Sequence, residues 1–194
     1  MKKRVILLTG TPCIGKTTTA KLLATKLNAD YINLTDYAKS HRLTLGEDKE
    51  RKTIIINEKK MTKKILETIN NIDKVNIIVD GHYASSVVPT DLVTKVFVLR
   101  RNPKELKTFM EKCGFEGVKL WENLSAEILD ICLVEALQGQ PGKVCELDIT
   151  GKKVEEVVNE ILDVVEKDKK CCNGIVDWLG MLEREGLTDQ YLKA

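Results

Sequence analysis

The feature that most constrains this chain is a short glycine-bearing motif near its beginning. Residues 10–17 read Gly-Thr-Pro-Cys-Ile-Gly-Lys-Thr and satisfy the pattern G-x-x-x-x-G-K-[ST]. The apolar run Val5–Leu8 precedes the motif, and the amphipathic segment Lys16–Leu27 follows it. A strand, a loop and a helix in this order bring the N–H groups of the loop to the positive end of the helix dipole. The motif therefore predicts a loop that binds the phosphate groups of a nucleotide.

Each residue type in the motif has a chemical task. The glycines allow a tight backbone turn, Lys16 brings a positive charge to the β- and γ-phosphates, and the Thr17 hydroxyl can coordinate Mg²⁺. A chance glycine-rich turn between a strand and a helix is the alternative, and the flanking pattern argues against it. The predicted nucleotide-binding residues of this segment are Gly10, Cys13, Ile14, Gly15, Lys16, Thr17 and Thr18.

A second group of candidate site residues follows the apolar run Ile77–Val79. Asp80 ends this run, where a carboxylate can hold Mg²⁺ through a bound water. His82 lies two residues further on, and this spacing puts both side chains on one side of an extended chain. A neutral imidazole there could orient or deprotonate an attacking water. A turn residue before Gly81 and a structural histidine are the alternatives.

The rest of the chain alternates between short apolar runs and segments with helical periodicity. Such alternation implies right-handed crossovers and a mostly parallel sheet covered on both faces. We expect a three-layer α/β fold with a five-stranded parallel sheet. The expected strands are Val5–Leu8, Tyr31–Ile32, Ile77–Asp80, Val96–Arg100 and Val144–Leu147. The expected helices are Lys16–Leu27, Asn57–Ile69, Pro103–Met110, Leu124–Leu137 and Val154–Val165.

Two stretches interrupt this alternation and are candidates for binding loops. Asp36–Lys52 is polar and charged, and it leaves the sheet after the second strand. Lys112–Asn123 is a shorter irregular piece between two helices. Residues 167–174 read as a linker, and a helical tail follows over Ile175–Leu192, with a break near Gly186.

Composition narrows the class of protein. The 194 residues carry 31 basic and 29 acidic side chains, a balance too even to predict nucleic-acid binding. No apolar run reaches the ~18 residues of a membrane span, and no secretory leader opens the chain. The 6 cysteines show no paired C-x-x-C spacing, and with only 2 histidines a zinc site is not expected. We expect a cytoplasmic protein with free thiols and no membrane partner.

Several segments together resemble the adenylate kinase isoenzyme 6 family of archaea and eukaryotes. The resemblance covers most of the chain, from about residue 4 to 179. The segments that carry it are Thr9–Thr18, Tyr31–Lys39, Asp80-x-His82, Val96–Arg100 and Lys119–Ile128.

The resemblance implies a nucleoside monophosphate kinase fold and an activity. It implies one P-loop kinase domain over residues 1–179, with a monophosphate-binding insert at about 33–56, a lid at about 112–122 and a helical tail over 180–194. It further implies that the protein uses ATP with Mg²⁺, transfers phosphate to AMP and hydrolyses ATP. The family is associated with maturation of the small ribosomal subunit, which implies a small-subunit ribosomal protein and a pre-ribosomal particle as partners. A nuclear location would be possible in a eukaryote.

The resemblance also assigns roles to single residues. It implies that Lys119 of the lid binds the nucleotide and that Thr17 and Asp80 hold the metal. The implied acceptor-binding residues are Asn33, Asp36 and Lys39. The implied catalytic residues are Lys16, Asp80, His82 and Arg100.

The sequence departs from the family pattern at three positions. Cys13 stands where the loop usually has glycine, and Cys113 and Phe109 stand where the lid usually has basic residues. An arginine at the transferred phosphoryl group is worth about 10³ or more in rate, so its loss predicts slow kinase turnover. The cations that could compensate are Arg100, Arg101, Lys112 and Lys119.

Three functions stay open at this point. The first is an ATP:AMP phosphotransferase, which the retained monophosphate-binding segment favours. The second is a slow ATPase that acts as an assembly factor, which the altered lid favours. The third is a P-loop kinase for another small metabolite.

Overall fold

A computed structural model describes residues 3–48, 53–167 and 169–193. Among these residues five strands form one parallel sheet in the order β2-β5-β1-β6-β7, which confirms the expected architecture. Its strands are β1 (Arg4–Thr9), β2 (Asp30–Asn33), β5 (Asn76–Asp80), β6 (Val93–Arg100) and β7 (Val144–Asp148).

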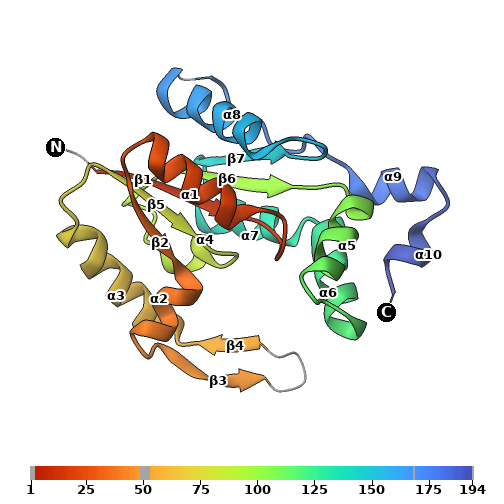
Figure 1. Ribbon diagram of the computed structural model, residues 1–194, viewed down its shortest axis with the longest axis horizontal. Helices are drawn as coiled ribbons and strands as arrows, with labels where there is room; N and C mark the ends of the chain where they lie inside the picture. The colour runs from red at the N-terminus through yellow and green to blue at the C-terminus, as the bar shows by residue number, and fades with distance from the viewer. Residues whose placement is uncertain (1–2, 49–52, 168, 194) are drawn as a thin grey trace.

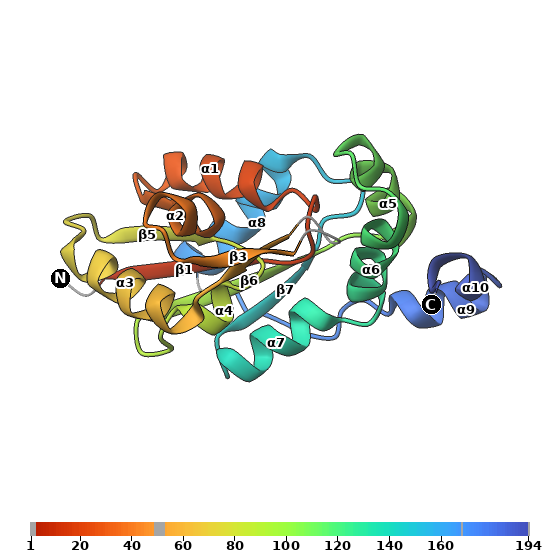
Figure 2. The same cartoon turned by 90° about the horizontal axis from the view of Figure 1, so that it is seen from below.

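Helices cover both faces of this sheet. Figure 2 shows α1 (Lys16–Lys26) and α8 (Val154–Lys167) on one side, and α3 (Glu58–Asn71), α4 (Ala84–Val87) and α7 (Ile131–Gly139) on the other. Successive side chains of the central strand β1 enter different hydrophobic clusters. Val5 and Leu7 pack on the α3 side, while Ile6 and Leu8 pack on the α1 side. This burial on both faces explains why the strand reads as a continuous apolar run.

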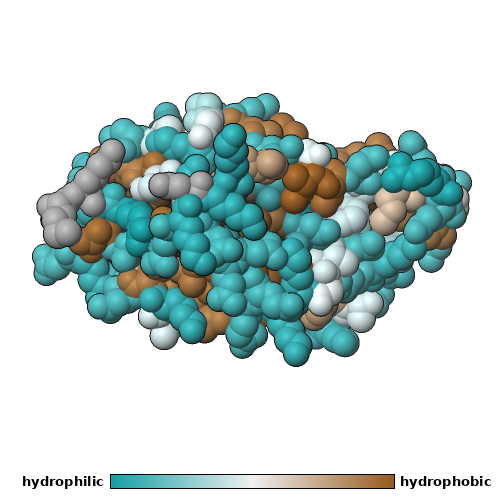
Figure 3. All heavy atoms as spheres, turned by 90° about the horizontal axis from the view of Figure 1, so that it is seen from above, coloured by the Kyte–Doolittle hydropathy of each residue, from teal (hydrophilic) through white to brown (hydrophobic). Residues whose placement is uncertain are grey.

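The face of the molecule seen from above is mostly hydrophilic. Figure 3 shows scattered hydrophobic patches on one face among a majority of polar residues. Within the described part of the chain, no helix has the length and apolar character that crossing a membrane requires.

The polar insert after β2 is structured. It contains α2 (Leu34–Ser40) and an antiparallel hairpin of β3 (Thr44–Asp48) and β4 (Thr53–Ile56). Figure 1 shows this hairpin extending away from the main sheet below α2. Residues 49–52 of the expected insert lie outside the described residues.

The prediction of one helix over Leu124–Leu137 is wrong. The helix α5 (Pro103–Lys112) is followed by α6 (Gly117–Ile128), so much of the expected irregular piece 112–123 is helical. The chain then breaks before α7, because Asp130 adopts a left-handed conformation with φ 59°. The Asp130 carboxylate forms an ion pair with Arg100 of β6, a partner distant in sequence. No local breaker residue marks this position.

The C-terminal tail forms α9 (Trp178–Arg184) and α10 (Thr188–Tyr191), with Gly186 at φ 69° between them. This confirms the expected break. The suggested boundary at residue 179 falls inside α9.

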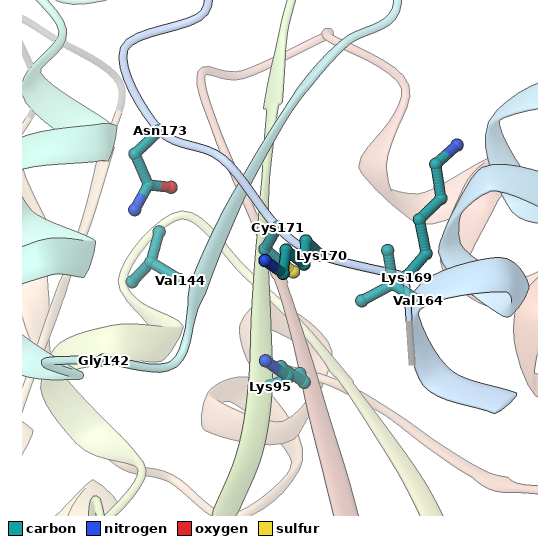
Figure 4. Close-up of a pocket in the computed structure, with 8 residues that line it drawn as sticks. All are labelled: Lys95, Gly142, Val144, Val164, Lys169, Lys170, Cys171 and Asn173. Carbon is teal, nitrogen blue, oxygen red and sulfur yellow. The ribbon is translucent and has the colours of Figure 1, made fainter. Parts of the chain in front are cut away.

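The prediction that the cysteines are all free thiols is wrong. Cys145 of β7 and Cys171 form a disulfide across a sequence separation of 26 residues. The segment after α8 returns along the edge strand, where the backbone N–H of Glu146 donates to the Cys172 carbonyl at 3.1 Å. A pocket of about 450 Å³ lies at this crossing. Figure 4 shows Cys171 among the residues that line it. The pocket is lined by Lys95, Gly142, Val144, Val164, Lys169, Lys170, Cys171 and Asn173.

Candidate active site

The glycine-bearing motif forms the loop between β1 and α1. Gly10 has φ 135°, and a Cβ at this position would lie 2.6 Å from the Leu99 carbonyl oxygen, so only glycine fits. Gly15, with φ 111°, is the N-cap of α1. Cys13 also has a positive φ, 63°, where a side chain costs about 1–2 kcal/mol relative to glycine. Ile14 is buried beneath the loop, and Thr18 is exposed in the first turn of α1.

The side chain of Lys16 is hydrogen-bonded to the backbone of its own loop. Its Nζ donates to the carbonyl oxygens of Gly10 and Thr11, each at 2.8 Å. Burial lowers the pKa of Lys16, and the charge of nearby Asp80 opposes this effect. The lysine is therefore held at the loop, where the oxygens of a bound phosphate could take over these hydrogen bonds.

Asp80 collects hydrogen-bond donors from neighbouring elements. Its Oδ2 accepts from Thr17 Oγ1 at 2.7 Å, from Tyr31 Oη at 3.0 Å and from Asn33 Nδ2 at 3.0 Å. The register of the sheet explains this, because Asn33 at the end of β2 pairs with Asp80 at the end of β5. Burial and the Asp80 charge raise the pKa of Tyr31 to about 12. Sequence reasoning missed Tyr31, although its spacing of two from Asn33 was a usable signal.

The oxygens of Thr17 and Asp80 suit a hard divalent cation. Among the described residues no group of three or more His, Cys, Asp or Glu side chains could hold a metal ion. A hydroxyl and a carboxylate in contact match Mg²⁺, which binds few protein ligands and keeps waters and substrate phosphates in its coordination shell. The residues present therefore fit the cation that the sequence predicted.

His82 borders a cavity of about 470 Å³ next to this group. Its ring reaches solvent, but the surrounding protein and the charge of Lys16 lower the pKa of His82 to about 4. Its imidazole is therefore neutral near pH 7. Tyr83 and Ser85 also line this cavity. Their hydroxyl oxygens are buried and have no hydrogen-bond partner among the described residues. The cavity is lined by Glu58, His82, Tyr83, Ser85, Ser86, Glu135, Gln138 and Gly139.

Arg100 does not fit the catalytic role expected for it. Its side chain is 1% exposed. Its Nε donates to Glu127 Oε1 at 2.9 Å, its Nη1 to Glu146 Oε1 at 2.6 Å, and its Nη2 bonds to Asp130. Each nitrogen of the guanidinium is thus already bound to acceptors. We therefore revise the expectation for Arg100 from a catalytic role to a structural one.

Arg101 lies closer to the phosphate-binding loop. Its Nη2 would be 4.0 Å from a Cβ at Gly15, and its guanidinium stacks 4.7 Å from the Phe109 ring centroid. Its Nη1 forms an ion pair with Glu105, whereas its buried Nε has no partner among the described residues. The sequence suggests Arg101 only as a compensating cation. In the structure its Nη2 lies nearest to Gly15 of the loop, whereas its Nε is buried.

The remaining predicted residues lie around this centre. Lys119 of α6 places its Nζ 5.0 Å from the Phe115 ring centroid. Burial and a hydrogen bond with Cys113 raise the pKa of Cys13 to about 12, so the loop and the end of α5 are in contact. Asp36 and Lys39 are exposed on α2, and the N–H of Asp36 donates to Asn33 Oδ1 at 3.0 Å.

Comparison with known proteins gives the family. Residues 6–130 match the model of the AAA domain. A protein of Thermococcus kodakarensis named "Putative adenylate kinase" is 42% identical over 175 residues, covering 90% of this chain and 92% of that protein. A protein of Methanocaldococcus jannaschii with the same name is 38% identical over 173 residues, covering 89% and 92%. The chain belongs to their family. It is an enzyme, a P-loop kinase.

Solved structures support the fold alone. The chain superimposes on a shikimate kinase from Acinetobacter baumannii with TM-score 0.61 and 14% identity, covering 86% of this chain and 94% of that one. It superimposes on a thymidylate kinase from Candida albicans with TM-score 0.55 and 16% identity, covering 89% and 96%. These chains are nucleotide- and small-molecule-kinase folds, consistent with the sheet order.

Proposed function

We propose that the protein is an ATP:AMP phosphotransferase that also hydrolyses ATP slowly. The observation that carries this proposal is the contact of Thr17 with Asp80, whose charge acts on the buried Lys16, while His82, two residues after Asp80, borders a separate cavity. A phosphate-binding loop next to a polar cavity offers a donor site and an acceptor site side by side. The archaeal relatives named as adenylate kinases support AMP as the acceptor.

In this proposal the loop binds the triphosphate of ATP and Lys16 contacts the β- and γ-phosphates. Thr17 and Asp80 would hold Mg²⁺, which supplies charge neutralisation when bound. Arg101, whose Nη2 lies nearest to Gly15 of the loop, would take the place of the basic residues replaced by Phe109 and Cys113. The phosphoryl group passes from ATP to a phosphate oxygen of AMP, and lid closure keeps out water that competes with this oxygen.

The acceptor would occupy the cavity next to His82 and the α2 side of the site. The hydroxyls of Tyr83 and Ser85 have no hydrogen-bond partner in the part of the chain that the structure describes, so they offer hydrogen bonds to a polar ligand. The exposed side chains of Asp36 and Lys39 lie on α2 of the insert. Asn33 connects the two sides, because its side chain both caps α2 and contacts Asp80.

Slow ATP hydrolysis is a second candidate function. A histidine that is neutral near pH 7 can accept a hydrogen bond from water and so orient it, and His82 borders a cavity and feels the charges of Lys16 and Asp80. The substitution of two lid cations by Cys113 and Phe109 also lowers the expected rate of transfer.

One experiment separates the two activities. The purified protein is incubated with ATP and Mg²⁺, with and without AMP, and ADP and phosphate are measured. Two ADP formed for each AMP consumed supports the phosphotransferase, whereas AMP-independent phosphate release supports the ATPase. Lys16→Met should abolish both, because it removes the cation at the phosphates. An unchanged rate in Lys16→Met would contradict the assigned site.

The link to the small ribosomal subunit and the cytoplasmic location stay predictions from the resemblance and the composition. Co-sedimentation of the protein with small-subunit particles, in the presence and absence of ATP, tests the first. No binding in either condition would contradict it.

A further inference from the structure

The C-terminal segment contacts the phosphate-binding loop through a buried carboxylate. Glu127 of α6 is 1% exposed. Its Oε2 accepts a hydrogen bond from Thr11 Oγ1 of the loop at 2.5 Å, and its Oε1 accepts from Trp178 Nε1 of α9 at 3.2 Å. Arg100 Nε and the backbone N–H of Arg101 donate to the same Oε1 at 2.9 Å and 3.2 Å. Glu127 therefore joins the loop, the end of β6 and the tail.

The contact continues from Thr11 to the lysine of the site. Thr11 is fully buried, and its carbonyl oxygen accepts from Lys16 Nζ at 2.8 Å. A displacement of Thr11 would therefore move an atom that holds Lys16. Small displacements at such a site matter, because an error of about 1 Å in the position of a reacting group can cost ~10²-fold in rate.

Several contacts fix Trp178 in place. Asp177 caps α9 by accepting from the Gly180 N–H at 2.8 Å, and Leu182 packs with Ile128 of α6 in a small hydrophobic cluster. The segment before α9 is held along β7, where the N–H of Ile175 donates to Glu146 Oε2 at 2.9 Å. The indole N–H thus comes from a docked element and bonds Oε1 of Glu127, whereas the loop bonds Oε2.

We infer that Trp178 and Glu127 are positioning residues for the phosphate-binding loop, and that the C-terminal segment is part of the nucleotide site. This inference rests on the proposed function, since it assumes that the loop binds ATP. A buried carboxylate needs its full set of donors to stay in one place. Without the indole N–H, Glu127 loses one donor and its position is less fixed, so the hydrogen bond from Thr11 Oγ1 to Glu127 Oε2 weakens.

The test compares Mg·ATP affinity among matched variants by calorimetric titration. Trp178→Phe keeps a buried aromatic ring, smaller than the indole, and removes the N–H. We expect its Kd for Mg·ATP to rise about tenfold, as for loss of a hydrogen bond to a charged group. Tyr191→Phe is the control, because Tyr191 packs with Ile128 and Leu182 where the tail meets α6, and no hydrogen bond from its hydroxyl to Glu127 occurs among the described residues. This control should bind with unchanged affinity.

Thr11 provides a second measurement that does not depend on the tryptophan. Thr11→Val removes the hydroxyl and should weaken Mg·ATP binding about as much as Trp178→Phe. Thr11→Ser keeps the hydroxyl and should restore most of the affinity. In the double variant Trp178→Phe/Thr11→Val the two losses should not add, because both act through Glu127. AMP affinity should stay unchanged in all variants.

Two results would overturn the inference. One is a Trp178→Phe protein that melts at a lower temperature but binds Mg·ATP as the control does, which would leave Trp178 a purely structural role. The other is full additivity of the two substitutions. If the unsubstituted protein itself binds no Mg·ATP, the proposed function fails instead, so the two failures are distinguishable.

Discussion

The disulfide between Cys145 and Cys171 gives the sharpest prediction about stability. It closes a loop with a sequence separation of 26 residues. In the chain-entropy model, a cross-link over such a loop stabilises the folded state by roughly 3.5 kcal/mol at 25 °C. For a chain of 194 residues this corresponds to a melting-temperature change of roughly 7–14 °C. Cys171→Ser should show this loss. Cys171 is the position to substitute, because Cys145 is buried in the core and a change there would also disturb packing.

The assay is urea unfolding followed by tryptophan fluorescence, in oxidising buffer and again with excess dithiothreitol. Cys172→Ser is the matched control, since Cys172 is the adjacent residue, is exposed and is a free thiol. In oxidising buffer only Cys171→Ser should be destabilised. With reductant the unsubstituted protein should lose the same stability, and the difference between the two proteins should disappear. Peptide mapping without reductant should recover the cross-linked peptides.

A specific pair of outcomes would refute this reasoning. If Cys171→Ser and Cys172→Ser unfold at the same urea concentration in oxidising buffer, the cross-link contributes nothing. If Cys171→Ser is equally destabilised in both buffers, the loss comes from packing of the side chain and not from the closed loop.

The two neighbouring arginines and the histidine give further predictions. Arg100→Met should lower the free energy of unfolding by about 3–5 kcal/mol in chemical unfolding, because it leaves Glu127 and Glu146 buried without their cation. A variant of normal stability with a reduced rate would support a catalytic role instead. Arg101→Met should instead raise the Kd for Mg·ATP about tenfold with a smaller loss of stability, and equal ATP affinity would argue against contact with the nucleotide. The pKa of His82 is 6.5 in the unfolded chain and about 4 in the folded protein. Between these pH values the imidazole is protonated only in the unfolded chain, so stability should fall as the pH drops from about 6.5 towards 4. His82→Gln should flatten that dependence in urea unfolding at several pH values, and ATP hydrolysis should show no His82-dependent inflection near pH 6.5.

Local patterns in the sequence predicted the layers of the fold and the centre of the site. Strand and helix periodicity depends on neighbours within a few residues, so the strands of the sheet and most of the helices followed from it. The motif around Lys16 and the carboxylate at the end of Ile77–Val79 are likewise local signals. Parallel strands end at the same edge of a sheet, which is why Thr17 and Asp80 could be expected to meet.

Other features of the site depend on residues far apart in the chain. Asp130 breaks a helix because Arg100 attracts its carboxylate, and Glu127 joins Thr11 to Trp178 across separations of 116 and 51 residues. No periodicity encodes such contacts. The different surroundings of Arg100 and Arg101 could not be read from the sequence for the same reason: Arg100 pairs with Glu127 and Glu146, whereas Arg101 pairs with Glu105.

The sequence by itself thus determined that a strand, a loop and a helix form a phosphate site, because the geometry of that loop depends on residues that are adjacent in the chain. Only the tertiary structure decided which thiols pair, which arginine is buried among carboxylates and what the tail contacts. Those outcomes depend on which side chains meet when the sheet and its helices pack, and the burial of charge in that packing selects the partners.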